Sequence, residues 1–520
     1  MSDATIAATI DRRRPFRITT RPSVLSDKAP DTRPTRHAAL GRTPGTNLPV
    51  SLAQPAAPTG PGRGAPKGNT MRKLASVLIL LALLGMASAQ VQVRWFVGLG
   101  AGTDEPVIVA QQAVVDAYNA SQNEIRLVLE IVDNDQAYDI LATQIAAGNA
   151  PDIVGPVGIR GRSAFPGAWL DLSDLIAAAN YDLNDFDPAL VEFYRIEGQG
   201  QIGLPFAVFP SYMSYNKALF DEAGIAYPPS RYGDPYVTAD GEELPWNLDT
   251  LRDLAMELTV DGQGNDATMA SFDPNRIVQW GFGVMWTDIR GQLTLFGSGN
   301  FADADGNAVI PAHWADGAQW LHDAMWRDHF YPNGPYGGSD LLAGGNWFES
   351  GNLAMAQTHL WYQGCCMFGL QDEWALAPMP AAADGTVTAK LHADTFSITT
   401  ASRNPEAAFQ ALTHLVSPEV SGVLAAIYGG MPARLSLQDA YLDSFGAEKF
   451  PTRDIDWTVV GDSLAFPDNP NHEEGMPAFR EAEALYNAFH QRLQNIADLD
   501  VAGELATLRA EMQLLFDSAR

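Results

Sequence analysis

Residues 91–154 decide the fold class, and they read VQVRWFVGLGAGTDEPVIVAQQAVVDAYNASQNEIRLVLEIVDNDQAYDILATQIAAGNAPDIV. Three apolar runs have the length and composition of strands: residues 91–97, 126–132 and 152–154. Helical apolar spacing fills the two intervals, after a cap at Thr103 or Asp104 and again over residues 136–147. Strand–helix–strand alternation at this pitch predicts an α/β fold with a parallel sheet and right-handed crossovers.

Beyond this segment, helical patterns alternate with turn-rich surface loops, and no repeat of fixed period occurs. Later helices are predicted at residues 248–258, 311–326, 404–416, 419–427, 476–495 and 502–519. With 46% hydrophobic residues, the chain can bury a large core, and its length predicts two or three domains.

Charge divides the chain into two unlike parts. The 520 residues carry 33 Lys+Arg and 62 Asp+Glu, a formal net charge of −29. Residues 1–70 instead hold 11 basic and 4 acidic side chains, with 10 of the 34 prolines and none of the 12 tryptophans. The remainder has no basic stripe to displace phosphate counterions, so we expect no nucleic-acid partner. Two cysteines exclude a disulfide scaffold and a cysteine-rich zinc module.

Residues 71–89 have the pattern of a secretory signal peptide. Basic residues precede an apolar run too short to span a bilayer, and a small-x-small site closes the segment at Ala87–Ala89. Because a signal peptide works from the beginning of a chain, we expect Met71 to be the true start and residues 1–70 to be a disordered, mis-assigned extension. A basic tail with its own role is the alternative. The mature chain would begin at Gln90, carry a charge of −38 and, having no cysteine after the cleavage site, lack a lipid anchor.

Motifs for catalysis or cofactors are incomplete. The loop 98–103 lacks the spacing of a phosphate-binding loop, and we expect a turn whose amides can face a cleft. The run from Asp303 resembles a calcium loop but has Trp314 where a bidentate Glu is needed. His472-Glu473-Glu474 lacks the second histidine of a zinc protease motif. We therefore expect no enzyme activity, no cofactor and no metal.

Six short patterns recur in a specific order along the chain. They are residues 149–154 (NAPDIV), 203–206 (GLPF) with 214–220 (SYNKALF), 245–251 (PWNLDTL), 348–351 (FESG) with Ala354 and Met355, 377–380 (APMP) with 396–398 (FSI), and 429–434 (GGMPAR). Over roughly residues 91–440, this series resembles the extracellular solute-binding proteins of bacterial ABC importers, in the sugar-binding branch that includes the maltose-binding protein.

The resemblance implies two lobes, each a mostly parallel sheet flanked by helices, with a ligand cleft at the hinge. Strands would cross between the lobes near residues 205–210, 394–398 and 429–432. The lobes are then expected at 90–207 plus 395–428, and at 208–394 plus 429–520. Hinge closure over the ligand would signal a loaded carrier to the permease.

The implied function is binding of a mono- or oligosaccharide and its delivery to ABC permease subunits. The carrier would be a monomer in the periplasm or outside the cell. A neutral sugar also suits the acidity, because a strongly negative chain repels anionic solutes. A secreted carbohydrate-active enzyme is one alternative. A carrier for polyamines or glycerol phosphates is another.

Aromatic ligand contacts follow from the same resemblance. Trp361 stands where sugar-binding relatives place a stacking tryptophan, and Tyr362 follows it. Phe209 occupies a hinge-strand position where maltose-binding relatives have a carboxylate, and Tyr212 lies on the same stretch. Core packing is the alternative for each of them. The secondary candidates for a ligand contact are three other tryptophans: Trp95, Trp286 and Trp347.

Other candidates lie at the expected strand tips and crossings. Gly155 and Pro156 follow the NAPDIV strand, at its cleft-facing end. Asp394 and Thr395 sit at the second crossing, where the carboxylate could accept two charge-assisted hydrogen bonds or act as a cap or surface acid. Arg434 is either a ligand donor or a partner for one of the many carboxylates.

Cys365 and Cys366 are adjacent in a chain expected to meet an oxidising compartment, where thiols pair. A bridge between neighbours strains the backbone because their Cα atoms are only about 3.8 Å apart. We expect a vicinal disulfide forming a rigid apolar plate beside Trp361. Two buried free thiols are the alternative.

Overall fold

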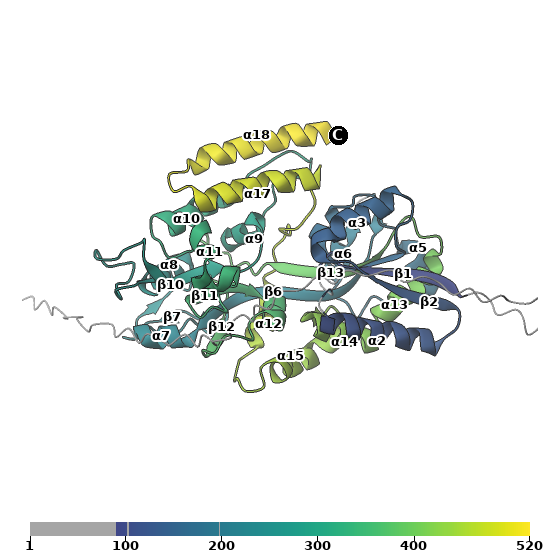
Figure 1. Cartoon of the computed structure of the whole chain (residues 1–520), viewed down its shortest axis with the longest axis horizontal. Helices are drawn as coiled ribbons and strands as arrows, with labels where there is room; N and C mark the ends of the chain where they lie inside the picture. The colour runs from purple at the N-terminus through teal and green to yellow at the C-terminus, as the bar shows by residue number, and fades with distance from the viewer. Residues whose placement is uncertain (1–89, 101–102, 104, 197, 520) are drawn as a thin grey trace, which may run out of the picture. The chain divides into compact units, whose positions relative to one another are not determined.

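The structure is a computed structural model that describes residues 90–519 except 101–102, 104 and 197 (Figure 1). The expected signal peptide and basic extension lie outside the described residues. The described chain from Gln90 onward belongs to one compact unit built around a ten-stranded sheet. Its order is β2-β1-β3-β13-β6-β11-β10-β9, with β12 and β14 also paired to β6.

The first part of the sheet follows the pattern of residues 91–154. β1 (Val91–Val97) pairs in parallel with β2 (Ile125–Ile131) along its whole length and with β3 (Ile153–Gly158) on its other side. α2 (Glu105–Ser121) and α3 (Asn134–Ala146) make the two crossovers. The α/β prediction is confirmed here, since strands and helices alternate in the predicted order and the strands pair in parallel.

One long strand joins the two halves of the sheet. β6 (Leu204–Asn216) has 13 residues, all buried. Its first part pairs with β13 (Leu391–Ile398) and β14 (Met431–Pro432), and its second part pairs with β11 (Leu353–His359) and β12 (Trp374–Ala377). These pairs are all antiparallel, so parallel pairing is confined to the strands on either side of this centre.

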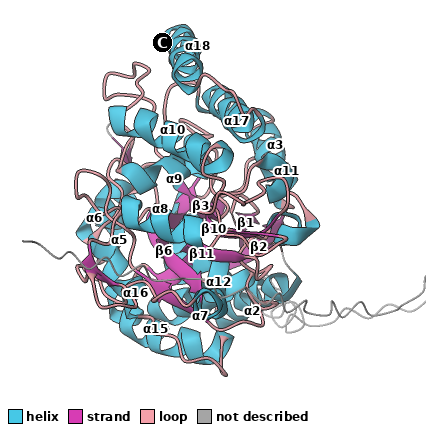
Figure 2. Ribbon diagram, turned by 90° about the vertical axis from the view of Figure 1, so that its left-hand side faces the viewer, coloured by secondary structure: helices cyan, strands magenta, loops and turns pink. Residues whose placement is uncertain are grey.

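The second half of the sheet continues from β11 to β10 (Ile277–Val284), which is parallel to it, and ends at β9 (Val260–Asp261). Helices lie on both sides of the strands (Figure 2). α17 (Phe479–Asn495) and α18 (Val501–Ala519) pack side by side on this half and against α10 (Ala312–Trp326) (Figures 1 and 2).

The remaining helices include several that the sequence predicts. They are α4 (Ile159–Ser163), α5 (Ser173–Ala179), α6 (Pro188–Phe193), α7 (Lys217–Ala223), α8 (Leu248–Glu257), α9 (Ile289–Leu293), η1 (Thr294–Phe296), α11 (Gly334–Gly337), η2 (Asp340–Gly345), α12 (Leu360–Cys365), α13 (Pro405–Leu415), α14 (Pro418–Tyr428), α15 (Leu435–Lys449), α16 (Thr458–Asp462) and η3 (Ser463–Ala465). Two small hairpins pair β4 (Arg195–Ile196) with β5 (Gly200–Gln201), and β7 (Tyr236–Val237) with β8 (Glu243–Leu244). The sequence analysis did not predict α15, because this helix buries only Tyr441 and Phe445 and shows no continuous apolar stripe.

Within the described residues, no helix by itself is long and apolar enough to cross a membrane. α13 and α14 meet the length and composition requirement only when taken together, with a 68° bend between them.

Candidate functional site

Trp361 lies in a stack of aromatic rings at the centre of the sheet. α12 begins directly after β11 and leaves the indole half-buried. Its ring stacks on Trp286, with centroids 6.0 Å apart and planes 15° apart, and on His359 at 5.0 Å and 28°. Trp286 is 44% exposed, so the stack presents a flat aromatic face to solvent. Flat, half-exposed indoles suit the C–H faces of a sugar ring.

Trp286 is held in an uncommon backbone conformation. It follows β10 by two residues and has φ of +34°, in the left-handed region that bulky side chains rarely adopt. Its indole N–H donates to the carbonyl of Gly345 at 3.1 Å, and Tyr362 packs edge-on at 5.3 Å. These contacts compensate for the strain and fix the ring orientation. Strain of this kind clusters at ligand sites.

A pocket of about 410 Å³ lies beside Trp286, and we call it the tryptophan pocket. Trp286 and Trp347 line it together with the end of β10, α11 and the C-terminal turns of α17. Its polar lining consists mainly of uncharged amides: Gln292, Asn333, Gln491, Gln494 and Asn495. No Asp, Glu, Lys or Arg among the described residues lines this pocket. Its volume is typical of small-molecule sites.

His490 is the only titratable residue that lines the tryptophan pocket in the described chain. Burial lowers the pKa of His490 to about 4, so its imidazole is neutral at pH 7. The Nε atoms of Gln292 and Gln494 lie 3.2 and 3.0 Å from His490 Nε2, where an amide N–H can donate to it. The pocket is therefore polar but uncharged.

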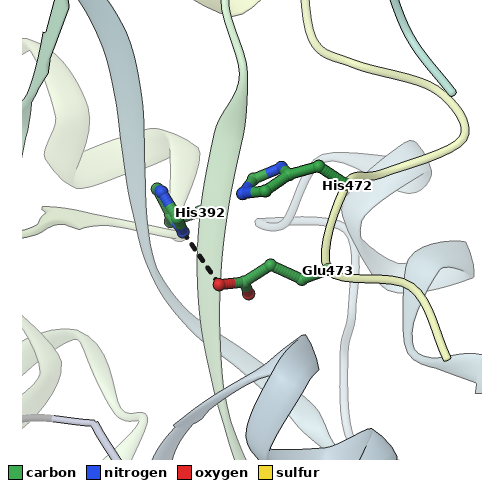
Figure 3. A group of neighbouring side chains, drawn as sticks. All are labelled: His392, His472 and Glu473. Atoms are coloured by element: carbon green, nitrogen blue, oxygen red, sulfur yellow. Dashed lines mark hydrogen bonds and ion pairs between the residues drawn. The ribbon is translucent and has the colours of Figure 1, made fainter. Parts of the chain in front are cut away.

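A second group of side chains extends from Trp361 on its other side. The ring of His392 lies 6.4 Å from Trp361, and His392 Nδ1 lies 3.1 Å from Glu473 Oε1. His472 packs against His392 at 4.7 Å (Figure 3). Donor atoms of the three residues lie within 4.8 Å of one another, so these are side chains that could together hold a metal ion.

Asp394 is half-buried next to this group. A Cβ atom on Gly158 would lie 3.3 Å from both Asp394 Oδ1 and Glu473 Oε2, so the two carboxylates approach the same point of the backbone. Burial, followed by the negative charge of Glu473, raises the pKa of Asp394 to about 7. Gly100 of the loop 98–103 also lies close to Asp394. Of the residues expected at the site, Trp361 and Asp394 therefore lie along one continuous group of side chains.

Several other expected contacts lie in the core. Tyr362 is fully buried and donates to Asn346 Oδ1 at 2.5 Å, and Tyr212 donates to Gln363 Oε1 at 2.9 Å. Phe209 packs against Gly430, and the hydroxyl of Thr395 donates to the carbonyl of Leu204 at 2.7 Å. These contacts agree with the core-packing alternative stated for the aromatic residues.

Gly155 and Pro156 are buried where β3 meets β13. A Cβ atom on Gly155 would lie 2.7 Å from the ring of Phe396, and the carbonyl of Gly155 accepts the indole N–H of Trp95 at 2.7 Å. The Gly155–Pro156 peptide bond is cis. Both residues therefore make close packing contacts in the sheet.

Arg434 is engaged by protein groups on every nitrogen. Its Nη1 pairs with Asp185 at 2.9 Å, Nη2 donates to the hydroxyl of Tyr181 at 2.8 Å, and Nε donates to the carbonyl of Val416 at 2.7 Å. The guanidinium also lies 4.6 Å from the ring centroid of Phe186. This arrangement favours the carboxylate-partner role over the ligand-donor role.

The structure joins Cys365 and Cys366 by a disulfide at the end of α12, with Cα atoms 3.7 Å apart. Cys365 is exposed and Cys366 half-buried. The carbonyl of Cys366 accepts a hydrogen bond from Asn346 at 2.9 Å, and Asn346 is also the partner of Tyr362. The bridge is thus connected to the residues that pack on Trp286.

A larger cavity of about 560 Å³ has a different chemistry. It lies between residues 159–199 and 469–476, and its charged lining includes Arg162, Arg195 and Glu474. Arg162 is buried, and its Nε has no hydrogen-bond partner in the described part of the chain. Burial lowers the pKa of the Arg162 guanidinium. An acceptor oxygen of a bound solute could satisfy this N–H group.

The sequence analysis set His472 and Glu473 aside for want of a second histidine nearby, and it did not single out His392. Residues 392 and 394 alternate on a strand, so they share a face, and this spacing could have placed His392 beside Asp394. The second histidine that the His472-Glu473 pair lacks locally is supplied by His392, 80 residues earlier. Trp286 and Trp347 were only secondary candidates, because no local sequence pattern shows that they border the same pocket.

Comparisons with known proteins agree with this fold. The sequence model of a family described as "Bacterial extracellular solute-binding protein" matches residues 105–422. No curated protein matches the chain in sequence.

Solved structures of similar fold cover nearly their entire length. UspC from Mycobacterium tuberculosis aligns with a TM-score of 0.58 and 22% identity over 82% of this chain and 100% of its own. An ABC substrate-binding protein from Listeria monocytogenes in complex with cycloalternan aligns with a TM-score of 0.61 and 17% identity, over 81% of this chain and 98% of its own. UgpB from M. tuberculosis in complex with glycerophosphocholine aligns with a TM-score of 0.58 and 15% identity, over 83% of this chain and 99% of its own. At these identities the likeness shows the fold, and it is the predicted one.

Proposed function

The chain belongs to the bacterial extracellular solute-binding proteins, and from this premise we propose that it binds a neutral carbohydrate and delivers it to an ABC-type permease. Members of this family are transport proteins found outside the cytoplasm. The expected signal peptide at residues 71–89 and a monomeric, unanchored mature chain fit that role. Hinge closure over the solute would present the loaded carrier to the permease.

The tryptophan pocket carries the proposal. In a chain with a net charge of −29, a pocket with two indoles, five amide side chains and no charged lining among its described residues is selective for an uncharged polar solute. Amides both donate and accept hydrogen bonds, as the hydroxyl groups of a sugar require. The indoles supply apolar faces for the ring. The cycloalternan in the Listeria structure is a solute of this class.

Trp361 supports the site from behind. The indole of Trp361 stacks on the indole of Trp286. We therefore propose that Trp361 fixes the orientation of Trp286, and that Trp286 contacts the sugar. Asp394 lies beyond His392 and would contact a longer oligosaccharide that extends from the pocket across the aromatic stack. Cys365–Cys366 would act as a rigid support for Trp286 through Asn346.

Thermal-shift and calorimetric titration of the purified protein with a panel of neutral mono- and oligosaccharides tests the proposal. A sugar present at 100 times its Kd should add about 2.7 kcal/mol to the free energy of unfolding. Trp286→Ala should abolish binding, and Trp286→Phe should retain part of it. Gln494→Leu should weaken binding, whereas the matched change Gln319→Leu on the exposed face of α10 should not.

A response to no sugar, together with a response to amines or phosphates, would overturn the carbohydrate assignment. The protein should also leave the sugar intact. Release of hydrolysed product by pure protein would favour the alternative of a secreted carbohydrate-active enzyme.

A phosphate-containing solute is the second candidate, because Arg162 is buried in the larger cavity and its Nε has no hydrogen-bond partner among the described residues. The UgpB structure holds glycerophosphocholine in the same fold. If this candidate is correct, glycerol phosphodiesters should stabilise the protein, and Arg162→Gln should remove the effect while Trp286→Ala leaves it.

A further inference from the structure

We propose that His392, His472 and Glu473 form a binding site for one zinc-type divalent transition-metal ion. One donor atom from each of the three lies within 4.8 Å of the other two. His392 comes from the central strand β13, and the other two come from the loop between η3 and α17 (Figure 3). None of the three residues lines the tryptophan pocket, and metal binding can be measured on the protein without a solute.

His472 is already oriented as a metal ligand. Its side chain is 1% exposed, and Nδ1 lies 2.7 Å from Asp468 Oδ2, whose own side chain is fully buried. The Nδ1–H therefore donates to the carboxylate, and the lone pair is on Nε2. Nε2 is buried without a hydrogen-bond partner in the described chain. A carboxylate behind a histidine that fixes its tautomer is the usual support of metal-binding imidazoles.

Asp468 is itself firmly held. It accepts the backbone N–H groups of Leu391 and His472, each at 2.7 Å, and an amide N–H of Asn471 at 3.1 Å. Since Leu391 precedes His392 on β13, the same carboxylate fixes the loop to the strand that supplies the other histidine. The orientation of His472 toward His392 is thus determined by the backbone (Figure 3).

The spacing of the donors fits a small ion. His392 Nδ1 and Glu473 Oε1 are 3.1 Å apart. A tetrahedral ion with bonds of about 2.0–2.1 Å holds its donors roughly 3.4 Å apart. This pair already has that spacing, and the third donor needs to approach by at most about 1.4 Å.

The donor set selects the class of ion. Two imidazole nitrogens and one carboxylate oxygen suit zinc and neighbouring transition metals, whereas calcium and magnesium prefer oxygen ligands only. His392 also has a buried Nε2 without a partner among the described residues, so its proton can move there when Nδ1 binds the ion. Three protein ligands leave a fourth position for a water molecule.

The test is a zinc titration of the purified full chain after treatment with a chelator, followed by calorimetry. We expect one Zn²⁺ per chain and a rise in melting temperature. His472→Ala and His392→Ala should each weaken binding by at least about 100-fold, and Asp468→Asn by about 10- to 100-fold. Glu474→Gln, next to the site, and His313→Ala, on the exposed start of α10, are controls that should bind zinc as the unmodified protein does.

Two outcomes would refute the site: no saturable zinc binding by the folded protein, or binding that His472→Ala and Glu473→Gln leave unchanged. Glu473→Gln keeps the side-chain shape and so remains informative if a histidine variant fails to fold. Cobalt(II) absorption in the visible range reports coordination directly. Sugar binding is measured separately, so failure of the metal site and failure of the carbohydrate proposal are distinguishable.

Discussion

His490 connects the chemistry of the tryptophan pocket to stability. In the unfolded chain its pKa is near 6.5, and burial lowers the pKa in the folded protein to about 4. Between these pH values the unfolded state binds more protons, so the free energy of unfolding should fall as the pH drops from 6.5 to 4. The loss attributable to His490 is at most about 3 kcal/mol.

Urea unfolding at pH 7 and at about pH 4.5 measures this effect. His490→Gln should reduce the difference between the two pH values, whereas Gln319→Leu, which changes no titratable group, should leave it as it is. An identical pH dependence in the His490 variant would contradict the assignment.

Arg434 offers a prediction that separates its two possible roles. Removing the guanidinium in Arg434→Met breaks hydrogen bonds to Asp185, Tyr181 and Val416 and should destabilise the protein by about 2–3 kcal/mol. The affinity for the solute should stay the same, because no nitrogen of Arg434 remains free. A loss of affinity without a loss of stability would restore the ligand-donor role.

At the scale of elements, α8 packs on β10 through a position that has no room for a side chain. A Cβ atom on Gly281 would overlap the backbone carbonyl of Ala255, in the interior of α8. Gly281→Ala should therefore destabilise the protein by about 3 kcal/mol. The control is Gly262→Ala, where the nearest atom, the carbonyl oxygen of Arg276, would lie 3.6 Å from the new Cβ. Equal urea midpoints for the two variants would show that the helix can shift to admit the methyl group.

The end of α12 yields a prediction about covalent structure. If Cys365 and Cys366 are joined in the secreted protein, reduction adds two hydrogens, an increase of about 2 Da in intact mass. Mass spectrometry with and without reductant measures it. An unchanged mass would mean that two thiols lie beside Asn346 and that no plate supports Trp286.

Elements differed in how well the sequence predicted them. β1 and β2 follow from apolar runs of strand length, and α2 and α3 from the helical spacing of apolar residues between them. β6 is buried along its whole length and so lacks the alternation of a half-exposed strand. Its role was predicted only through the resemblance to solute-binding proteins. α15 has too few buried residues to produce a pattern.

For the whole molecule, the sequence predicted the family and the two-part α/β sheet but only part of the site. Trp361 and Asp394, which flank motifs of the family, lie along one group of side chains near the centre of the sheet, and their contact with the ligand stays a prediction. The tryptophan pocket joins the end of β10 to α17, about 200 residues later, and the histidines come from segments 80 residues apart. Contacts over such separations depend on tertiary packing and leave no periodic signal.

The shared strand β6 has a consequence for how the protein loses its structure. If either half of the sheet unfolded, β6 would lose two of its paired strands. Its buried backbone N–H and C=O groups would then lack hydrogen-bond partners, which would destabilise the half that is still folded. The two halves should consequently unfold in a single cooperative transition, with a calorimetric enthalpy equal to the van't Hoff enthalpy. Two resolved heat-absorption peaks in the solute-free protein would show that β6 can fray at its middle and that each half persists alone.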